Sequence, residues 1–146
     1  MFGKKEVSTE PEEVVSVIKE AIESQGFKYD YNPQTKIFKT LFRGDDYDIL
    51  TTIMVTDAVI RFRCTLDGKA FKSNFQDVVW ELNKINMEML SGKFVLDTRD
   101  GSIYFATSVP YRIAVVTVDF ILKYTRAVVE LFDDYDGRLK EIAEKQ

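Results

Sequence analysis

The feature that most constrains this fold is a long stretch, residues 27–66, in which apolar and polar side chains alternate. A period of two is typical of β-strands that bury one face. Three pairs of turn-forming residues divide the stretch: Asn32-Pro33, Gly44-Asp45 and Thr56-Asp57. The pattern therefore predicts a meander of four strands, with the ranges 27–31, 37–43, 47–55 and 59–66.

Pairing these strands across two-residue turns places one set of mainly apolar side chains on a single buried face. The set comprises Phe38, Thr40, Phe42, Tyr47, Ile49, Thr51, Ile53, Ile60, Phe62 and Cys64. Directly opposed residues lie on the same face of a sheet. The pairing therefore puts the mainly apolar residues of three successive strands on one common face. The alternating residues must then lie on the opposite face of the sheet.

Helical periodicity surrounds the strands. The first helix is predicted over 10–25, with Thr9 as its cap, and the second over 74–90, after a capping box at 73–76. A hairpin at Asp100-Gly101 is predicted to pair Leu96 with Phe105. Thr117 then begins a long third helix, whose apolar stripe is Phe120, Ile121, Tyr124, Val128, Leu131, Tyr135, Leu139 and Ile142.

The resulting order, α-β-β-β-β-α-β-β-α, predicts an α+β fold in which an antiparallel sheet carries helices on one face. The 146 residues suit one domain, 10–146, after a flexible tail, 1–9. The single cysteine, Cys64, is predicted to lie unreactive in the core and indicates a reducing compartment. With no signal peptide or apolar span in the sequence, we expect a cytoplasmic protein without membrane contact.

Catalytic and metal-binding patterns fail when they are tested. The chain has no histidine and one cysteine, which removes catalytic triads and most zinc sites. The acidic cluster 133–137 resembles the start of an EF-hand loop, but Phe132 and Ala143 then occupy positions that require carboxylates. We interpret that cluster as a solvated part of the last helix. No catalytic, cofactor or metal residue is predicted, and the alternative is a small-ligand-binding protein or a carboxylate-based enzyme of unknown substrate.

The outer face of the predicted sheet is unusually apolar. Antiparallel sheets commonly place polar groups on the face that contacts water. Here five aliphatic residues are expected on it beside Arg61 and Arg63: Ile37, Leu41, Leu50, Met54 and Val59. We interpret this set as a protein-contact surface; the alternative is that loops or the N-terminal segment cover it.

Basic residues on the same face also allow a nucleic-acid-associated regulator. The residues are Lys39, Arg43, Arg61 and Arg63. The net charge of −4, Asp48 on this face and the lack of an interleaved aromatic argue against a nucleic-acid partner.

The second helix carries a further stripe, formed by Trp80, Asn83 and Met87, about a third of a turn from its main apolar stripe. Tryptophan and methionine are enriched at interfaces, so the stripe predicts a homodimer contact; the alternative is a helix buried on two sides. Asn86 lies within the main stripe and is predicted to hold a neighbouring loop by hydrogen bonds.

Three segments together resemble the YbjN family, which is grouped with the type III secretion chaperone-like fold: 82–86 (Leu-Asn-Lys-Ile-Asn), 92–97 (Gly-Lys-Phe-Val-Leu-Asp) and Asp100-Gly101. The resemblance implies an antiparallel sheet with flanking helices, frequent homodimerisation and no known catalysis. Relatives of this kind bind extended segments of other proteins. We therefore expect a non-catalytic protein-interaction module, chaperone-like or regulatory, that acts as a homodimer and binds a segment of another protein.

Overall fold

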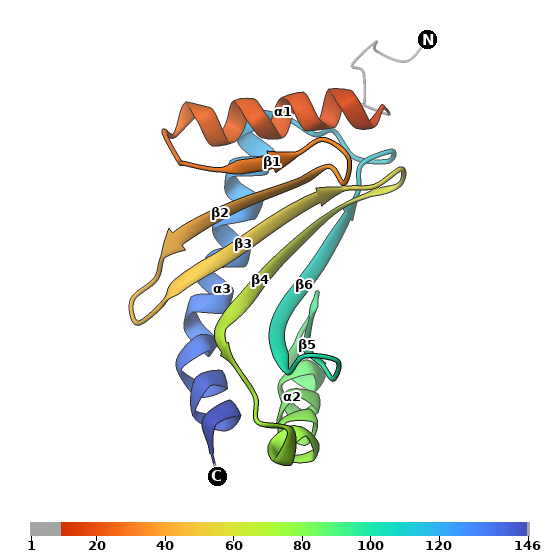
Figure 1. The fold of residues 1–146 in the computed structure, drawn as a ribbon. Coiled ribbons are helices and arrows are strands. Elements are labelled where there is room, and N and C mark those ends of the chain that lie inside the picture. Colours follow the sequence, from red (N-terminus) through yellow and green to blue (C-terminus); the bar gives the residue numbers. More distant parts are fainter. Residues whose placement is uncertain (1–9, 146) are drawn as a thin grey trace.

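The computed structural model describes residues 10–145 and confirms the predicted α+β order (Figure 1). Its elements are α1 (Pro11–Ser24), β1 (Asp30–Asn32), β2 (Ile37–Arg43), β3 (Asp48–Val55), β4 (Val59–Lys69), the 3₁₀ turn η1 (Lys72–Asn74), α2 (Phe75–Glu88), β5 (Lys93–Asp97), β6 (Ser102–Pro110) and α3 (Val118–Glu144). The predicted tail, 1–9, with its cap at Thr9, lies outside the described residues. No helix within 10–145 has the length and apolar character needed to cross a membrane.

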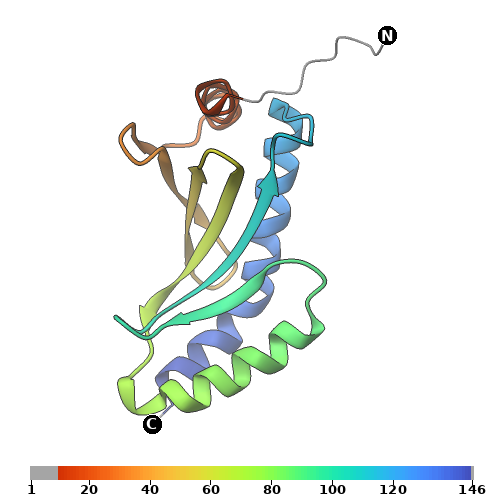
Figure 2. The same cartoon turned by 90° about the vertical axis from the view of Figure 1, so that its right-hand side faces the viewer.

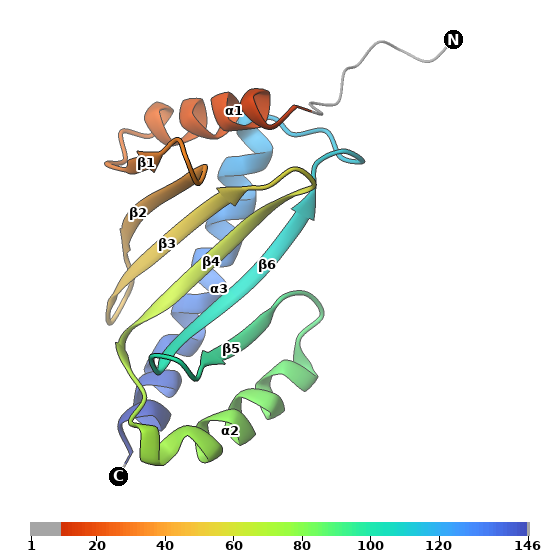
Figure 3. The same cartoon turned by 45° about the vertical axis from the view of Figure 1, so that its right-hand side comes forward.

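The strands form one antiparallel sheet in the order β1-β2-β3-β4-β6-β5. The long helix α3 runs along one face of the sheet (Figures 1 and 2). Near its N-terminal half α3 meets α1, and near its C-terminal half it meets α2 (Figure 3). One face of the sheet is therefore covered by helices.

The β2–β3 and β3–β4 turns lie one residue later than predicted. Gly44 N–H donates to Tyr47 O, and Thr56 N–H donates to Val59 O, so the predicted registers shift by two residues. The β5–β6 turn lies one residue earlier than predicted, because Leu96 pairs with Ile103 rather than Phe105. A shift of two returns every side chain to the same face of the sheet, so the predicted faces are correct although the turns were not.

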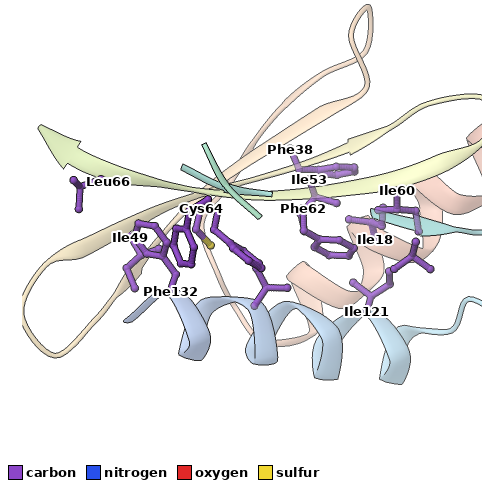
Figure 4. Close-up of a cluster of buried hydrophobic side chains, with 14 of the residues drawn as sticks. Ile18, Phe38, Ile49, Ile53, Ile60, Phe62, Cys64, Leu66, Ile121 and Phe132 are labelled. Carbon is purple, nitrogen blue, oxygen red and sulfur yellow. The ribbon is translucent and has the colours of Figure 1, made fainter. Parts of the chain in front are cut away.

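The core lies between the sheet and α3 (Figure 4). Side chains from β2, β3 and β4 point from the inner face toward α3, and Ile121 and Phe132 of α3 meet them. Helix α1 adds Ile18 to the same cluster. The predicted α3 stripe does face the core: Ile121, Val128 and Leu139 are buried, and Phe120, Tyr124, Leu131, Tyr135 and Ile142 pack half-buried against it. Phe132 and Asp136 are also buried, although the predicted stripe left them out.

Two further details differ from the sequence prediction. The first strand is Asp30–Asn32 rather than 27–31, so it starts later and includes Asn32, which was predicted to lie in the turn. Phe27 lies outside the strand, and its ring packs edge-on against Phe42, with centroids 5.0 Å apart. The capping box at 73–76 does not form: η1 occupies that position, and the side chain of Asn74 instead donates to Ala143 O and Lys145 O near the end of α3. The predicted cap at Thr117 does form, since its Oγ1 accepts from Phe120 N at 3.1 Å.

Candidate protein-contact surfaces

An apolar pair lies uncovered on the outer face of the sheet. Leu41 of β2 and Leu50 of β3 are direct cross-strand partners, and they are 61% and 39% exposed. Ile37 and Met54 form another cross-strand pair on this face, half-buried, and Val59 at the start of β4 is also half-buried. Among residues 10–145, no helix covers this face (Figure 3). We call these five residues the outer patch.

Cationic side chains lie beside the outer patch. Arg61 is the cross-strand partner of Met54, and Arg63 and Lys39 both flank Thr52 of β3. None of these three cations forms an ion pair with another described residue. An unpaired guanidinium favours an anionic partner, which gives this apolar surface a charge preference.

The sequence analysis missed one aromatic residue on this face. Tyr104 of β6 points outward, and the Arg63 guanidinium lies 3.9 Å from the centre of its ring. The argument that no aromatic accompanies the basic residues was therefore wrong. The signal was present in the sequence, because buried Ile103 and Phe105 flank Tyr104 and a period of two places it outside.

The edges of the sheet are less available than its outer face. The Asn86 amide donates to Phe94 O at 2.9 Å, and its Oδ1 accepts from Phe94 N at 2.7 Å, so α2 occupies the free edge of β5 at this point. Asn86 was predicted to hold a neighbouring loop by hydrogen bonds; the bonds are present, but they hold strand β5. At the other edge, β1 has only three residues. Short or covered edges discourage strand addition, so the face is the more available surface.

Helix α2 presents a second apolar surface, the α2 stripe of Trp80, Asn83 and Met87. Trp80 is 66% exposed and Met87 79% exposed. Val79 beside them is half exposed. This helix is therefore not buried on two sides within the described chain.

The acidic cluster of α3 corrects another interpretation. Asp136 is 1% exposed and neither carboxylate oxygen has a hydrogen-bond partner among the described residues, so this part of the helix is not simply solvated. Burial, followed by the negative charges of Asp133, Asp46 and Asp45, raises the pKa of Asp136 to about 6. The β2–β3 loop rests here, because Asp45 N–H donates to Asp133 Oδ1 at 3.0 Å. No group of three or more metal-ligating side chains occurs in the described part of the chain.

The single thiol lies in the core. Cys64 has no exposed surface, and burial raises its pKa to about 11 although the Thr51 hydroxyl lies 3.4 Å from its sulfur. A protonated, enclosed thiol is a poor nucleophile.

Known proteins share features of this sequence and this architecture. The YbjN family model, described as a proposed bacterial sensory transduction regulator, matches residues 15–141. No curated protein matches the chain significantly in sequence.

Several solved structures share the fold. YbjN from E. coli, a proposed transcription regulator, has a TM-score of 0.67 and 15% identity over 87% of this chain and 89% of that one. The ExsC–ExsE complex has a TM-score of 0.65 and 12% identity, over 90% of this chain and 97% of that one. The Yersinia pestis type III secretion chaperone SycH, in complex with a stable fragment of YscM2, has a TM-score of 0.55 and 11% identity. The match covers 86% of this chain and 98% of that one. At these identities the likeness establishes a common fold, that of the type III secretion chaperones.

Proposed function

This chain belongs to the YbjN family, and we propose that it is a non-catalytic, cytoplasmic protein-interaction module, chaperone-like or regulatory. In this proposal it acts as a homodimer and binds a segment of another protein. The solved structures of similar fold include two that are complexes with a second protein, ExsC–ExsE and SycH with the YscM2 fragment, which supports a protein-binding role.

The observation that carries the proposal is the uncovered Leu41–Leu50 pair beside unpaired Arg61 and Arg63. Burying one such side chain contributes about 1.5–3 kcal/mol, so two or three can support specific binding. The cations select a segment that alternates apolar and acidic residues, and the association weakens as salt screens the charges. We assign the outer patch, with Arg61 and Arg63, to this partner.

The test uses labelled amphipathic peptides with apolar and acidic residues, and measures binding by fluorescence anisotropy. In the double variant Leu41→Ser/Leu50→Ser we expect affinity for the best-binding peptide to fall at least about tenfold, with unfolding free energy changed by about 1 kcal/mol or less. Ile113→Ser is the matched control, because Ile113 is 83% exposed and lies outside the patch. Unchanged binding in the double variant would remove the assignment, and loss of the fold would make these residues part of the core.

We assign the homodimer contact to the α2 stripe. Trp80 and Met87 offer the large exposed side chains that dominate interface energetics. Sedimentation at micromolar concentration should give twice the 16.9 kDa chain mass. Trp80→Ala/Met87→Ala should sediment as a monomer, whereas a wild-type monomer that persists to near-millimolar protein contradicts the dimer.

The stack of Arg63 on Tyr104 supports a second candidate, a nucleic-acid-associated regulator. Net charge of −4 opposes it. Anisotropy with a labelled single-stranded oligonucleotide separates the two, since only nucleic-acid binding predicts saturation by that probe at moderate salt.

A further inference from the structure

A groove unrelated to the outer patch opens on the helical side of the sheet. It has a volume of about 650 Å³ and is bounded by the C-terminal end of α1, the end of β2 and the N-terminal half of α3. These elements meet to the left of α3 and below α1 in Figure 1. Cavities of about 300–1,000 Å³ suit small organic ligands.

The walls of the groove are mainly apolar. Its aliphatic and aromatic lining includes Ile22, Phe42, Ile53, Ile121, Leu122 and Val129. Phe27 also lines it and remains 42% exposed, although its ring packs edge-on against Phe42. A large aromatic ring left half exposed beside an apolar hollow indicates a surface that a ligand can cover.

The two threonines of the lining offer no free hydroxyl. The Thr40 hydroxyl donates to Lys28 O at 2.8 Å. The Thr125 Oγ1 atom makes no hydrogen bond with the described residues, but it is enclosed and a ligand in the groove cannot reach it. Recognition by the groove therefore rests on its apolar walls and its charged rim.

The rim of the groove is cationic in a chain of net charge −4. The lining includes Arg43, Lys123 and Arg126 and one carboxylate, Glu130. Arg126 pairs with Glu130 at 3.0 Å and Lys123 with Asp119 at 3.1 Å, but such exposed pairs one helical turn apart are weak and can exchange. Arg43 forms no ion pair with a described residue. Strand alternation assigned Arg43 to the outer face, but it ends β2 at the sheet edge beyond the residues that pair with β1, and there it lines the groove.

We propose that this groove binds a small amphipathic carboxylate of the fatty-acid type. The apolar chain fills the hollow between Phe42 and Val129, and the carboxylate pairs with Arg43 and Arg126 at the rim. The inference is independent of the proposed protein-binding function, because none of these residues belongs to the outer patch or the α2 stripe.

The experiment is calorimetric titration of the full chain with sodium dodecanoate below its micelle concentration. We expect saturable binding of one molecule per chain. Val129→Trp, which fills the hollow, should abolish binding, and Arg43→Gln/Arg126→Gln should weaken it about tenfold or more. Arg99→Gln is the matched control, since this exposed arginine lies on the β5–β6 hairpin and should leave affinity unchanged.

Two comparisons make the result decisive. Dodecanol, which has the same chain without the charge, should bind at least tenfold more weakly. Leu41→Ser/Leu50→Ser should bind dodecanoate like the wild type, which separates this site from the outer patch. Absence of saturable binding, unchanged binding in Val129→Trp, or equal affinity for dodecanol overturns the proposal. Circular dichroism and the thermal midpoint verify that each variant is folded.

Discussion

The two faces of β2, β3 and β4 share the same strands, register and twist, yet one is buried in the core and the other is partly exposed. On the inner face, Phe38 and Phe62 have no exposed surface. On the outer face, Leu41 and Leu50 are just as apolar but remain 61% and 39% exposed. The difference is the second layer, because α3 covers only one face. Alternation therefore identifies two faces, but packing decides which of them is core.

The inner face also determines how its polar groups behave. Thr40 and Thr51 are buried there with hydrogen-bonded or sulfur-contacting hydroxyls, whereas Asp136 of α3 is buried without a hydrogen-bond partner among the described residues. Burial is tolerated when a polar group is satisfied and costly when it is not. The helix layer thus contains a destabilising carboxylate, and the open face contains none that is buried.

The largest expected contrast is in thiol labelling. Cys64 should react with a maleimide at neutral pH at least about 1,000-fold more slowly than a thiol placed on the outer face by Leu41→Cys in a Cys64→Ser background. Burial and a pKa of about 11 keep the native thiol protonated and enclosed. Mass spectrometry measures the two labelling rates. Comparable rates would mean that the inner face opens readily.

The second largest contrast is expected when a side chain is truncated to alanine, which should destabilise the fold more on the inner face than on the outer face. Phe62→Ala removes a buried ring that packs 4.7 Å from that of Tyr124, and should lower the unfolding free energy by about 3–5 kcal/mol. Leu50→Ala should cost about 1 kcal/mol or less, because that side chain is 39% exposed and no helix among residues 10–145 covers it. Urea denaturation measures both. Similar losses in the two variants would show the outer face to be covered.

Asp136→Asn should stabilise the fold. The folded-state pKa of about 6 lies above the ordinary value of 3.8, so folding favours the protonated acid, and wild-type stability falls as pH rises from about 4 through 6. Facing carboxylates from α3 and the β2–β3 loop, Asp133, Asp46 and Asp45, act in the same direction. The variant should gain about 1–3 kcal/mol at neutral pH and little at pH 4. A gain that is equal at both pH values would assign the effect to something other than the charge.

The smallest expected effect is on the outer face. Arg63→Gln removes the stack on Tyr104 and should lower the unfolding free energy by about 0.5–1 kcal/mol. Tyr104→Leu should have a similar effect, and the double variant should lose no more than either single one. Additive losses in urea denaturation would mean that the two side chains act independently.

Much of the fold was predictable because local rules agree with the tertiary structure. The period of two assigned Phe38, Ile53 and Phe62 to one face, and an error of one residue in each turn shifted the registers by two without exchanging the faces. The Asn86 tie followed from an amide within an apolar stripe. The family followed from the segments 82–86 and 92–97.

The sequence by itself determined the order of the elements, the two faces of the sheet and the apolar character of both. Only the tertiary structure decided that Asp136 is buried, that Val79 and Trp80 are exposed, and that residues of α1, β2 and α3 form a groove. The physical reason is distance along the chain. Periodicity shows on which side of its own strand or helix a side chain lies. Burial and cavities depend instead on residues far apart in the sequence, which meet only when the layers pack. Ile22 and Arg126, about 100 residues apart, line the same groove.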